Sequence, residues 1–340
     1  MPSSTIPAKA RPLPPGVYCP VITLYKNTPL QEIDLDAMYA HCQHLVRAGQ
    51  HGLVYLGTNG ELALLDRAER KQIVATARRA VKDLGIPDGD YPLVAGISAQ
   101  GTKETVQLAH DAHDAGAGWA LLLPPSYWAK AVSEEALLGY YRDVADASPL
   151  PVVVYNFPGV TSGVDLDSDQ LAALAVHPNI VAAKLTCGNV GKAVRLASTF
   201  SPAQFAVFGG SSDYLVPALE AGGVGCVTGL ANVFPAATAR VFDLWTQGRR
   251  EEARRLQQVV AGAEWACKKG LAATKYGAWW FVGRTRLGIE DRAAFAPRKP
   301  YLEIGEPLRR WTVQTMGVLE EDEAAILEPV EKNGKAYSAS

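Results

Sequence analysis

The sequence lacks the features that mark membrane proteins and nucleic-acid-binding proteins. Its 340 residues contain no uninterrupted apolar stretch long enough to cross a bilayer. The formal net charge is -2, so there is no excess of basic residues for nucleic acid or for an anionic membrane surface. We therefore expect neither a nucleic acid nor a membrane as a partner, and a composition of 48% hydrophobic and 20% charged residues is that of an ordinary globular chain.

Cysteine is scarce, and no Cys-x-x-Cys pair occurs. An odd number of scattered cysteines does not indicate a disulfide framework or a zinc site, and favours reduced thiols in an intracellular protein. The five cysteines are Cys19, Cys42, Cys187, Cys226 and Cys267.

The N-terminal stretch has no apolar segment of the kind found in secretory signal peptides. Five prolines between Met1 and Gly16 argue against an amphipathic targeting helix. The absence of acidic residues before Glu32, together with Lys9 and Arg11, makes a mitochondrial transit peptide the alternative. We expect a cytoplasmic protein in which residues 1–15 form an extended, proline-rich tail.

Metal and nucleotide signatures are also missing. The histidine pairs His41/His44 and His110/His113 lack an obvious acidic or third ligand at a strand end, and we place them on helix surfaces. The stretch 188–192 does not match a phosphate-binding loop, and no Gly-x-Gly-x-x-Gly follows the first predicted strand. The sequence therefore predicts no bound metal and no nucleotide cofactor.

Short apolar runs alternate with stretches of helical periodicity, which is the pattern of an α/β protein with a parallel sheet. Eight such strands, each followed by a helix, predict a (β/α)8 TIM barrel, with an open doubly wound sheet as the rival. We place the barrel at residues 16–235, a C-terminal helical segment at 236–318 and a weakly ordered tail at 319–340. The predicted strands are Val17–Leu24, Gly52–Leu56, Leu93–Ile97, Trp119–Leu123, Val152–Tyr155, Ile180–Lys184, Phe205–Phe208 and Gly225–Thr228.

Lys184 ends the sixth of these strands. The preceding residues, Ile180–Ala183, are all apolar and suit a strand that is buried on both faces. Desolvation favours the neutral amine of a lysine, which is a nucleophile able to form a Schiff base with a carbonyl. The alternative is a lysine at a strand end whose ammonium reaches solvent.

Other strand ends carry polar groups, and in a TIM barrel the chemistry gathers there. Gly57–Glu61 can cradle an anion with backbone N–H groups, although Thr58 and Glu61 also fit a helix capping box. Tyr155 can move a proton or hydrogen-bond an adduct, or it can be a core residue. Gly209–Asp213 offers hydroxyls and bare backbone, and this set suits a 2-oxo acid bound through its carboxylate, its ketone and its remaining hydroxyls.

Taken in order, these residues resemble the dihydrodipicolinate synthase / N-acetylneuraminate lyase superfamily of class I pyruvate aldolases. Gly57–Glu61 is similar to the family's Gly-Thr/Ser-x-Gly-Glu motif, and Tyr155–Pro158 is similar to its Tyr-x-x-Pro motif. Lys184 falls where the family carries its Schiff-base lysine. The resemblance runs from about Gly16 to Trp311 and implies a carbon–carbon lyase without a cofactor, whose covalent imine forms on Lys184.

The resemblance also implies roles for residues around the lysine. Tyr155 would move protons, while Thr58 and Asn59 would hold the carboxylate of pyruvate. Thr58 would also link Tyr155 to Tyr127, which in the synthases crosses from the neighbouring subunit. Family members are commonly homotetramers, built as dimers of dimers. The backbone carbonyl of Val227 would face Lys184.

Departures from the synthase pattern indicate the subfamily. Val160 stands where the synthases carry an arginine that binds the carboxylate of aspartate semialdehyde, which disfavours that substrate. Asn59 and the pair Gly210-Ser211 look more like the 4-hydroxy-2-oxoglutarate aldolases, whereas the surroundings of Val160 and Lys184 look like the 2-keto-3-deoxy-sugar-acid aldolases. We expect cleavage of a 2-oxo-4-hydroxy acid to pyruvate and an aldehyde. The alternatives are a synthase-type condensation of pyruvate with an aldehyde and a pyruvate-binding protein without turnover.

Overall fold

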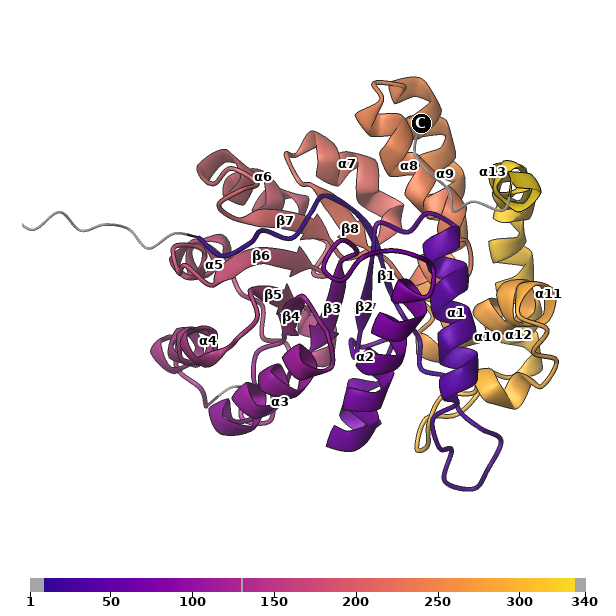
Figure 1. The fold of residues 1–340 in the computed structure, drawn as a ribbon. Coiled ribbons are helices and arrows are strands. Elements are labelled where there is room, and N and C mark those ends of the chain that lie inside the picture. The colour runs from indigo at the N-terminus through magenta and orange to yellow at the C-terminus, as the bar shows by residue number, and fades with distance from the viewer. Residues whose placement is uncertain (1–8, 130, 334–340) are drawn as a thin grey trace, which may run out of the picture.

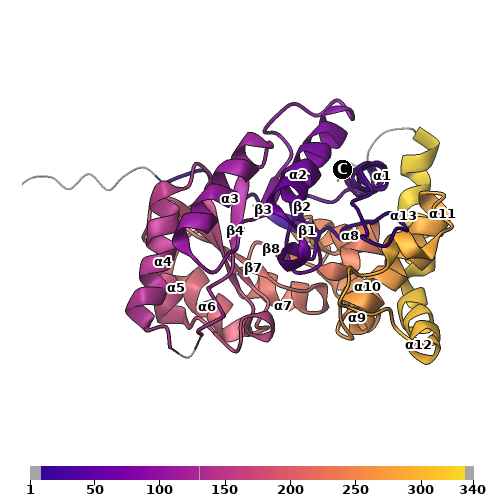
Figure 2. The same ribbon diagram turned by 90° about the horizontal axis from the view of Figure 1, so that it is seen from below.

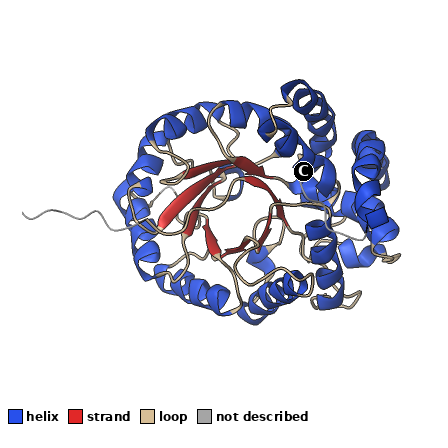
Figure 3. Cartoon of the chain, turned by 45° about the horizontal axis from the view of Figure 1, so that its top comes forward, coloured by secondary structure: helices blue, strands red, loops and turns tan. Residues whose placement is uncertain are grey.

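The computed structural model describes residues 9–129 and 131–333, and its centre is a closed barrel of eight strands. Every neighbouring pair is parallel, and β8 closes the ring by pairing with β1. Figure 3 shows this ring of strands enclosed by helices. The strands are β1 (Gly16–Pro20), β2 (Gly52–Tyr55), β3 (Leu93–Gly96), β4 (Trp119–Leu122), β5 (Val152–Asn156), β6 (Ile180–Leu185), β7 (Ala206–Gly209) and β8 (Gly225–Val227).

Helices alternate with the strands and cover the outside of the barrel, so the predicted (β/α)8 fold is confirmed. Their apolar stripes face the strands and their polar sides face water. The helices between strands are α1 (Leu35–Arg47), α2 (Arg67–Lys82), α3 (Thr102–Asp114), α4 (Glu134–Ala147), α5 (Ser168–Ala175), α6 (Val190–Thr199) and α7 (Leu215–Glu220).

A loop separates β1 from the first helix, α1. Residues after β1 make a short loop that is closed by an isolated antiparallel bridge between Tyr25 and Ile33. Asp34 then caps α1, because its side chain accepts a hydrogen bond from the backbone N–H of Ala37. The helix α1 therefore begins at Leu35.

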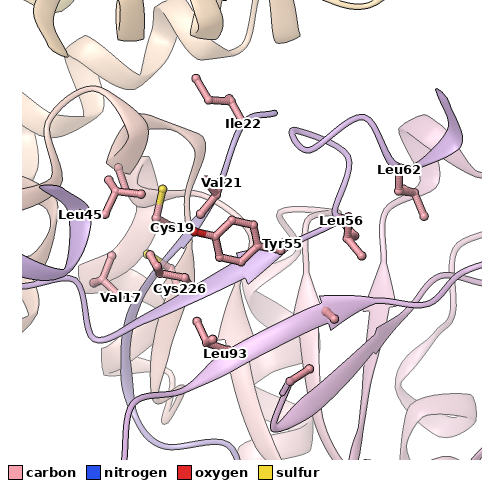
Figure 4. Close-up of a cluster of buried hydrophobic side chains, with 14 of the residues drawn as sticks. Val17, Cys19, Val21, Ile22, Leu45, Tyr55, Leu56, Leu62, Leu93 and Cys226 are labelled. Atoms are coloured by element: carbon pink, nitrogen blue, oxygen red, sulfur yellow. The ribbon is translucent and has the colours of Figure 1, made fainter. Parts of the chain in front are cut away.

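Two apolar layers hold the barrel together. The inner layer fills the barrel and includes Tyr18, whose ring packs edge-on against Phe208 with the ring centroids 5.5 Å apart. The outer layer lies between strands and helices. Figure 4 shows part of it, in which Cys19 and Tyr55 of neighbouring strands lie near Leu45 of α1. Burial of these side chains on both faces explains why the strands read as continuous apolar runs.

Helices beyond β8 extend the barrel on one side, next to α1 (Figures 1 and 2). The helix α8 contacts both β1 and α9, so the boundary that we place at residue 235 stays a prediction. The elements of this part are α8 (Pro235–Thr246), α9 (Arg250–Cys267), α10 (Leu271–Ala278), a π-helical turn (Trp279–Gly283), α11 (Arg284–Arg286), α12 (Glu306–Met316) and α13 (Glu320–Asn333).

The expectation of a weakly ordered tail from residue 319 is wrong for Glu320–Asn333, which form α13. Glu323 is buried and accepts hydrogen bonds from the backbone N–H groups of Ala236 and Ala237, at 3.0 and 2.6 Å. A carboxylate at the N-terminus of α8 satisfies unpaired amides and complements the helix dipole. The remainder of the predicted tail, residues 334–340, lies outside the described residues.

The predicted N-terminal tail is described only from residue 9 onward, and residues 9–15 have no regular secondary structure. Lys9 nevertheless fixes this segment to the barrel. Its Nζ donates to the carbonyl oxygens of Ala175, His177 and Ile180 at 2.6 to 2.9 Å. Of the described part of the chain, no helix has the length and apolar character needed to cross a membrane.

Candidate active site

Lys184 lies inside the barrel near the C-terminal end of β6, with only 3% of its surface exposed. An irregularity in the β5–β6 pairing places it there, because Val152 pairs with Ile180 whereas the next residue, Val153, pairs with Ala182. The extra residue in β6 shifts the alternation of side chains by one position. The side chain of Lys184 therefore points into the barrel. The alternative interpretation, a lysine whose ammonium reaches solvent, is wrong.

Tyr155 is the partner of Lys184 on the neighbouring strand. The two residues are in register, and Lys184 Nζ lies 3.9 Å from the centroid of the Tyr155 ring. The phenolic oxygen of Tyr155 lies 3.3 Å from Oγ1 of Thr58, which follows β2. An amine, a phenol and a hydroxyl from three strand ends thus lie close together within the barrel.

The turn after β2 does not form the capping box that was one interpretation of its sequence. Glu61 adopts a left-handed conformation with φ 57°, and its side chain accepts hydrogen bonds from Lys275 Nζ and the backbone N–H of Arg298. Asn59, on the same turn, faces Gly229, where a Cβ atom would lie only 2.8 Å from Asn59 Nδ2. The turn is therefore held by residues from the C-terminal half of the chain.

The turn after β7 approaches the end of β6 very closely. A Cβ atom at Gly210 would lie 2.1 Å from Oγ1 of Thr186, so this position has room only for glycine. The same Thr186 hydroxyl is buried and has no hydrogen-bond partner among the described residues. An unsatisfied buried hydroxyl is unfavourable, and a hydroxyl or carboxylate of a ligand would satisfy it.

One pocket joins these strand ends. Its lining includes most of the residues that the sequence predicts to bind substrate or to act in catalysis. These are Lys184, Tyr155, Thr58, Asn59, Gly210, Ser211 and Val227. It is also lined by residues that sequence reasoning missed. These are Pro20, Phe157, Thr186, Gly229, Glu264, Cys267, Lys268 and Thr274.

Two predicted residues lie elsewhere. Val160 is exposed in a short 3-10 turn, Pro158–Val160, and is not among the described residues that line the pocket. Tyr127 is 77% exposed beside Trp128, and the backbone N–H of Tyr127 donates to Gln100 Oε1 at 2.9 Å. Tyr127 belongs to the loop after β4 and does not reach Tyr155 within one chain.

The residues that were missed in the C-terminal half bring charge to the pocket. Glu264 is buried, and it accepts hydrogen bonds from the hydroxyls of Ser212 and Thr228, the latter at 2.6 Å. Burial raises the pKa of Glu264, although these hydroxyls partly counteract the shift. Glu264 lies on α9, and Lys268 directly follows this helix. Both were missed because the sequence analysis looked for functional residues at the ends of strands.

The described parts of the chain contain no group of three His, Cys, Asp or Glu side chains that lie close enough together to bind a metal ion. His41 corrects a detail of the sequence interpretation, because it is fully buried rather than on a helix surface. One of its ring nitrogens lies 3.3 Å from Asn232 Oδ1. Burial lowers the pKa of His41 to about 4.

The arrangement is suited to covalent chemistry on a ketone. A buried amine can attack the carbonyl, and the adjacent phenol can transfer protons to and from the adduct. The Thr58 hydroxyl and the Asn59 amide also line the pocket and can donate hydrogen bonds to a ligand.

Over most of its length the chain is similar to proteins that are named as aldolases. A protein of Coccidioides immitis, named provisionally as a mitochondrial 4-hydroxy-2-oxoglutarate aldolase, is 42% identical over 92% of this chain and 98% of its own length. The L-threo-3-deoxy-hexylosonate aldolase of Aspergillus niger is 35% identical over 87% of this chain and 98% of its own length. Relatives with these names agree with the predicted enzyme class, a carbon–carbon lyase.

Solved structures show the same fold. A dihydrodipicolinate synthase family protein from Coccidioides immitis superposes with a TM-score of 0.85 at 39% identity, covering 93% of this chain and 99% of the other. A prophage protein of Escherichia coli K12, solved in complex with pyruvate, reaches 0.78 at 28% identity over 90% of this chain and 98% of its own. The family model described as the dihydrodipicolinate synthetase family matches residues 14–274. The chain therefore belongs to the dihydrodipicolinate synthetase family, as its motifs predict.

Proposed function

We propose that this protein is a class I aldolase that cleaves a 2-oxo-4-hydroxy acid to pyruvate and an aldehyde. The observation that carries the proposal is the buried Lys184 amine, 3.9 Å from the centroid of the Tyr155 ring, whose phenol contacts Thr58. The names of the relatives support two substrate classes, 4-hydroxy-2-oxoglutarate and 3-deoxy-2-oxo sugar acids. The chemistry needs no cofactor, because the lysine itself supplies the electron sink.

The reaction begins when the neutral amine of Lys184 attacks the C2 ketone and water is lost, which leaves a protonated imine. A base removes the proton of the C4 hydroxyl, the C3–C4 bond breaks, and its electron pair moves into the imine to give an enamine. The aldehyde leaves at this step. Protonation of C3 and hydrolysis of the imine release pyruvate and regenerate the amine. Tyr155 is the group that we assign to the proton transfers.

The two ends of the substrate meet different parts of the pocket. Thr58 and Asn59 bind the C1 carboxylate, and the pyruvate held by the solved Escherichia coli relative supports an oxo acid of this size next to the lysine. Thr186 and Ser211 face the part of the substrate beyond C3. The unsatisfied Thr186 hydroxyl supports a polar group at that place.

We also propose that the active form contains more than one copy of the chain, as a homotetramer built from dimers. Tyr127 and Trp128 are large, exposed aromatic side chains, and such residues are enriched at protein interfaces. Contact with a second copy would cover them and bring Tyr127 to the Thr58–Tyr155 pair of the neighbour.

A panel of substrates tests the proposal. The purified full chain is supplied with 4-hydroxy-2-oxoglutarate, with several 2-keto-3-deoxy acids, and with pyruvate plus aspartate semialdehyde, and pyruvate is measured by a coupled dehydrogenase. Release of pyruvate from one of the hydroxy acids, with full activity in EDTA, is the expected result. Rapid consumption of pyruvate only with aspartate semialdehyde would instead favour the condensing reaction, despite Val160.

The compartment that we propose is the cytosol, because of the prolines in the first 16 residues. The word mitochondrial in the names of two relatives favours the alternative. Expression of the full chain with a C-terminal fluorescent protein, compared with a mitochondrial marker, separates the two.

A further inference from the structure

Lys268 brings a positive charge into the pocket from outside the barrel. It directly follows α9, and its side chain is 38% exposed. Its Nζ donates to Ser211 Oγ at 2.8 Å and lies 3.2 Å from Asp213 Oδ2. Both partners belong to the turn after β7, so the ammonium is fixed beside Ser211 at the edge of the pocket.

The lysine retains a capacity for a further ligand. An ammonium carries three N–H donors, of which the Ser211 hydroxyl and the Asp213 carboxylate account for two. Lys268 is itself one of the residues that line the pocket, whereas Asp213 is not among the described lining residues. A ligand in the pocket can therefore accept a hydrogen bond from the third N–H group while Lys268 keeps its ion pair with Asp213.

The charges of the pocket favour an anion next to Lys268. The other cation of the lining is Lys184, whose nitrogen becomes the protonated imine at C2, next to the C1 carboxylate. The one acidic group of the described lining is Glu264. The carboxyl of Glu264 is engaged by the hydroxyls of Ser212 and Thr228. For a ligand with a second negative charge, away from C1, Lys268 is the cation of the described lining that can neutralise that charge.

The position of Lys268 matches the far end of the substrate. Thr58 and Asn59 follow β2, and Lys184 lies on β6. Ser211 follows β7, the neighbour of β6, on the side away from β5. An oxo acid with C1 at the β2 turn and C2 at Lys184 extends its remaining carbons toward Ser211 and Lys268.

We propose that Lys268 binds the distal carboxylate of a five-carbon 2-oxo diacid and so makes 4-hydroxy-2-oxoglutarate, rather than a sugar acid with an uncharged tail, the preferred substrate class. The inference rests on the proposed function, because it takes the C2 position at Lys184 as given. A charge-assisted hydrogen bond to a carboxylate is about twice as strong as one to a neutral hydroxyl. Specificity follows because the uncharged tail leaves the ammonium with a weaker partner.

Two unreactive oxo acids test the charge recognition without the cleavage step. 2-Oxoglutarate and 2-oxopentanoate have the same chain length, differ in the distal carboxylate, and lack the C4 hydroxyl needed for cleavage. Each is added over a range of concentrations with borohydride, and the reduced adduct on Lys184 is measured by mass spectrometry. The quantity compared is the ratio of the two half-saturating concentrations within each protein, which does not depend on the fraction of active enzyme.

The variants are Lys268→Met and Lys268→Arg, with Lys269→Met as the matched control. Lys269 is the next lysine along the chain, but its Nζ lies over the rings of Trp265 and Trp311, outside the pocket. Thermal unfolding checks that each variant is folded. Lys268→Met should weaken trapping of 2-oxoglutarate about 10- to 100-fold relative to 2-oxopentanoate, as expected for a lost charge-assisted bond. Lys268→Arg should recover part of the ratio, and Lys269→Met should stay within about twofold of the wild type.

The kinetic counterpart is the ratio of kcat/KM for 4-hydroxy-2-oxoglutarate to that for a 2-keto-3-deoxy hexonate. In Lys268→Met this ratio should fall mainly through KM. An unchanged trapping ratio in Lys268→Met, or a wild type that prefers the uncharged tail, overturns the assignment of Lys268 while leaving the aldolase intact. A wild type that traps neither oxo acid nor pyruvate and cleaves nothing overturns the proposed function, and this inference with it.

Discussion

Lys275 and Glu61 form an ion pair that water does not reach. Lys275 Nζ lies 2.6 Å from Glu61 Oε1, and the two side chains are 0% and 1% exposed. Lys275 also donates to the carbonyl oxygen of Thr23 at 2.7 Å. The pair connects α10 to the turn that carries Thr58 and Asn59, so the C-terminal helices hold the turn to which we assign the substrate carboxylate.

Removal of one partner of this pair should be far more damaging than removal of both. Lys275→Met leaves the Glu61 carboxylate buried without its counter-ion, for which we expect a loss of about 3–5 kcal/mol in the free energy of unfolding. The double variant Lys275→Met with Glu61→Gln should regain a substantial part of this loss. Urea unfolding of the wild type, both single variants and the double variant measures the coupling, and additive losses would show that the pair does not act as a unit.

Tyr155→Phe isolates the phenolic hydroxyl. The ring that packs against Lys184 Nζ is kept, while the contact with Thr58 Oγ1 is lost. If Tyr155 transfers protons, kcat for the best hydroxy acid should fall about 10²- to 10⁴-fold, with a much smaller change in KM. Steady-state kinetics measure this, and a kcat within a few-fold of the wild type would remove Tyr155 from the mechanism.

The buried carboxyl of Glu323 should make stability depend on pH. Burial raises the pKa of Glu323 to about 7, although the amides of Ala236 and Ala237 counteract the shift. The folded state therefore binds this proton more tightly than the unfolded state, whose glutamate has a pKa of about 4.3. The contribution is fully present below the unfolded pKa and is lost as the pH rises through 7.

Glu323→Gln keeps the shape but does not titrate. Between pH 5 and pH 8 the wild type should lose about 2–3 kcal/mol of unfolding free energy relative to this variant. Urea unfolding of both proteins at the two pH values measures the difference. Parallel pH profiles would show that Glu323 is ionised in the folded state throughout.

The exposed aromatic loop after β4 tests the proposed assembly. We expect Trp128→Lys to convert the oligomer to a smaller species and to lower kcat, because Tyr127 would no longer reach a neighbouring site. Sedimentation velocity measures the change. Val176→Lys is the control, since Val176 is also exposed but follows α5 at the opposite end of the barrel. A wild type that sediments as a monomer with full activity would contradict the assembly.

The barrel and its lysine could be predicted because their signals are local. Each strand is a short apolar run, and the position of Lys184 at the end of such a run is visible in the sequence. The contribution of Glu264 and Lys268 was not predictable in this way, since only the packing of α9 against the turn after β7 brings them to the pocket. The helix α13 was missed because its acidic residues suggest disorder, whereas Glu323 is buried against α8.

The most direct measurement is reductive trapping of pyruvate on Lys184. Borohydride is added to the wild type with pyruvate, and peptides are mapped by mass spectrometry beside Lys184→Arg and the pocket variant Lys268→Met. We expect one pyruvate adduct on Lys184 in the wild type and in Lys268→Met, and none in Lys184→Arg. A wild type that forms no adduct on Lys184 while it still releases pyruvate from a hydroxy acid would contradict the imine mechanism.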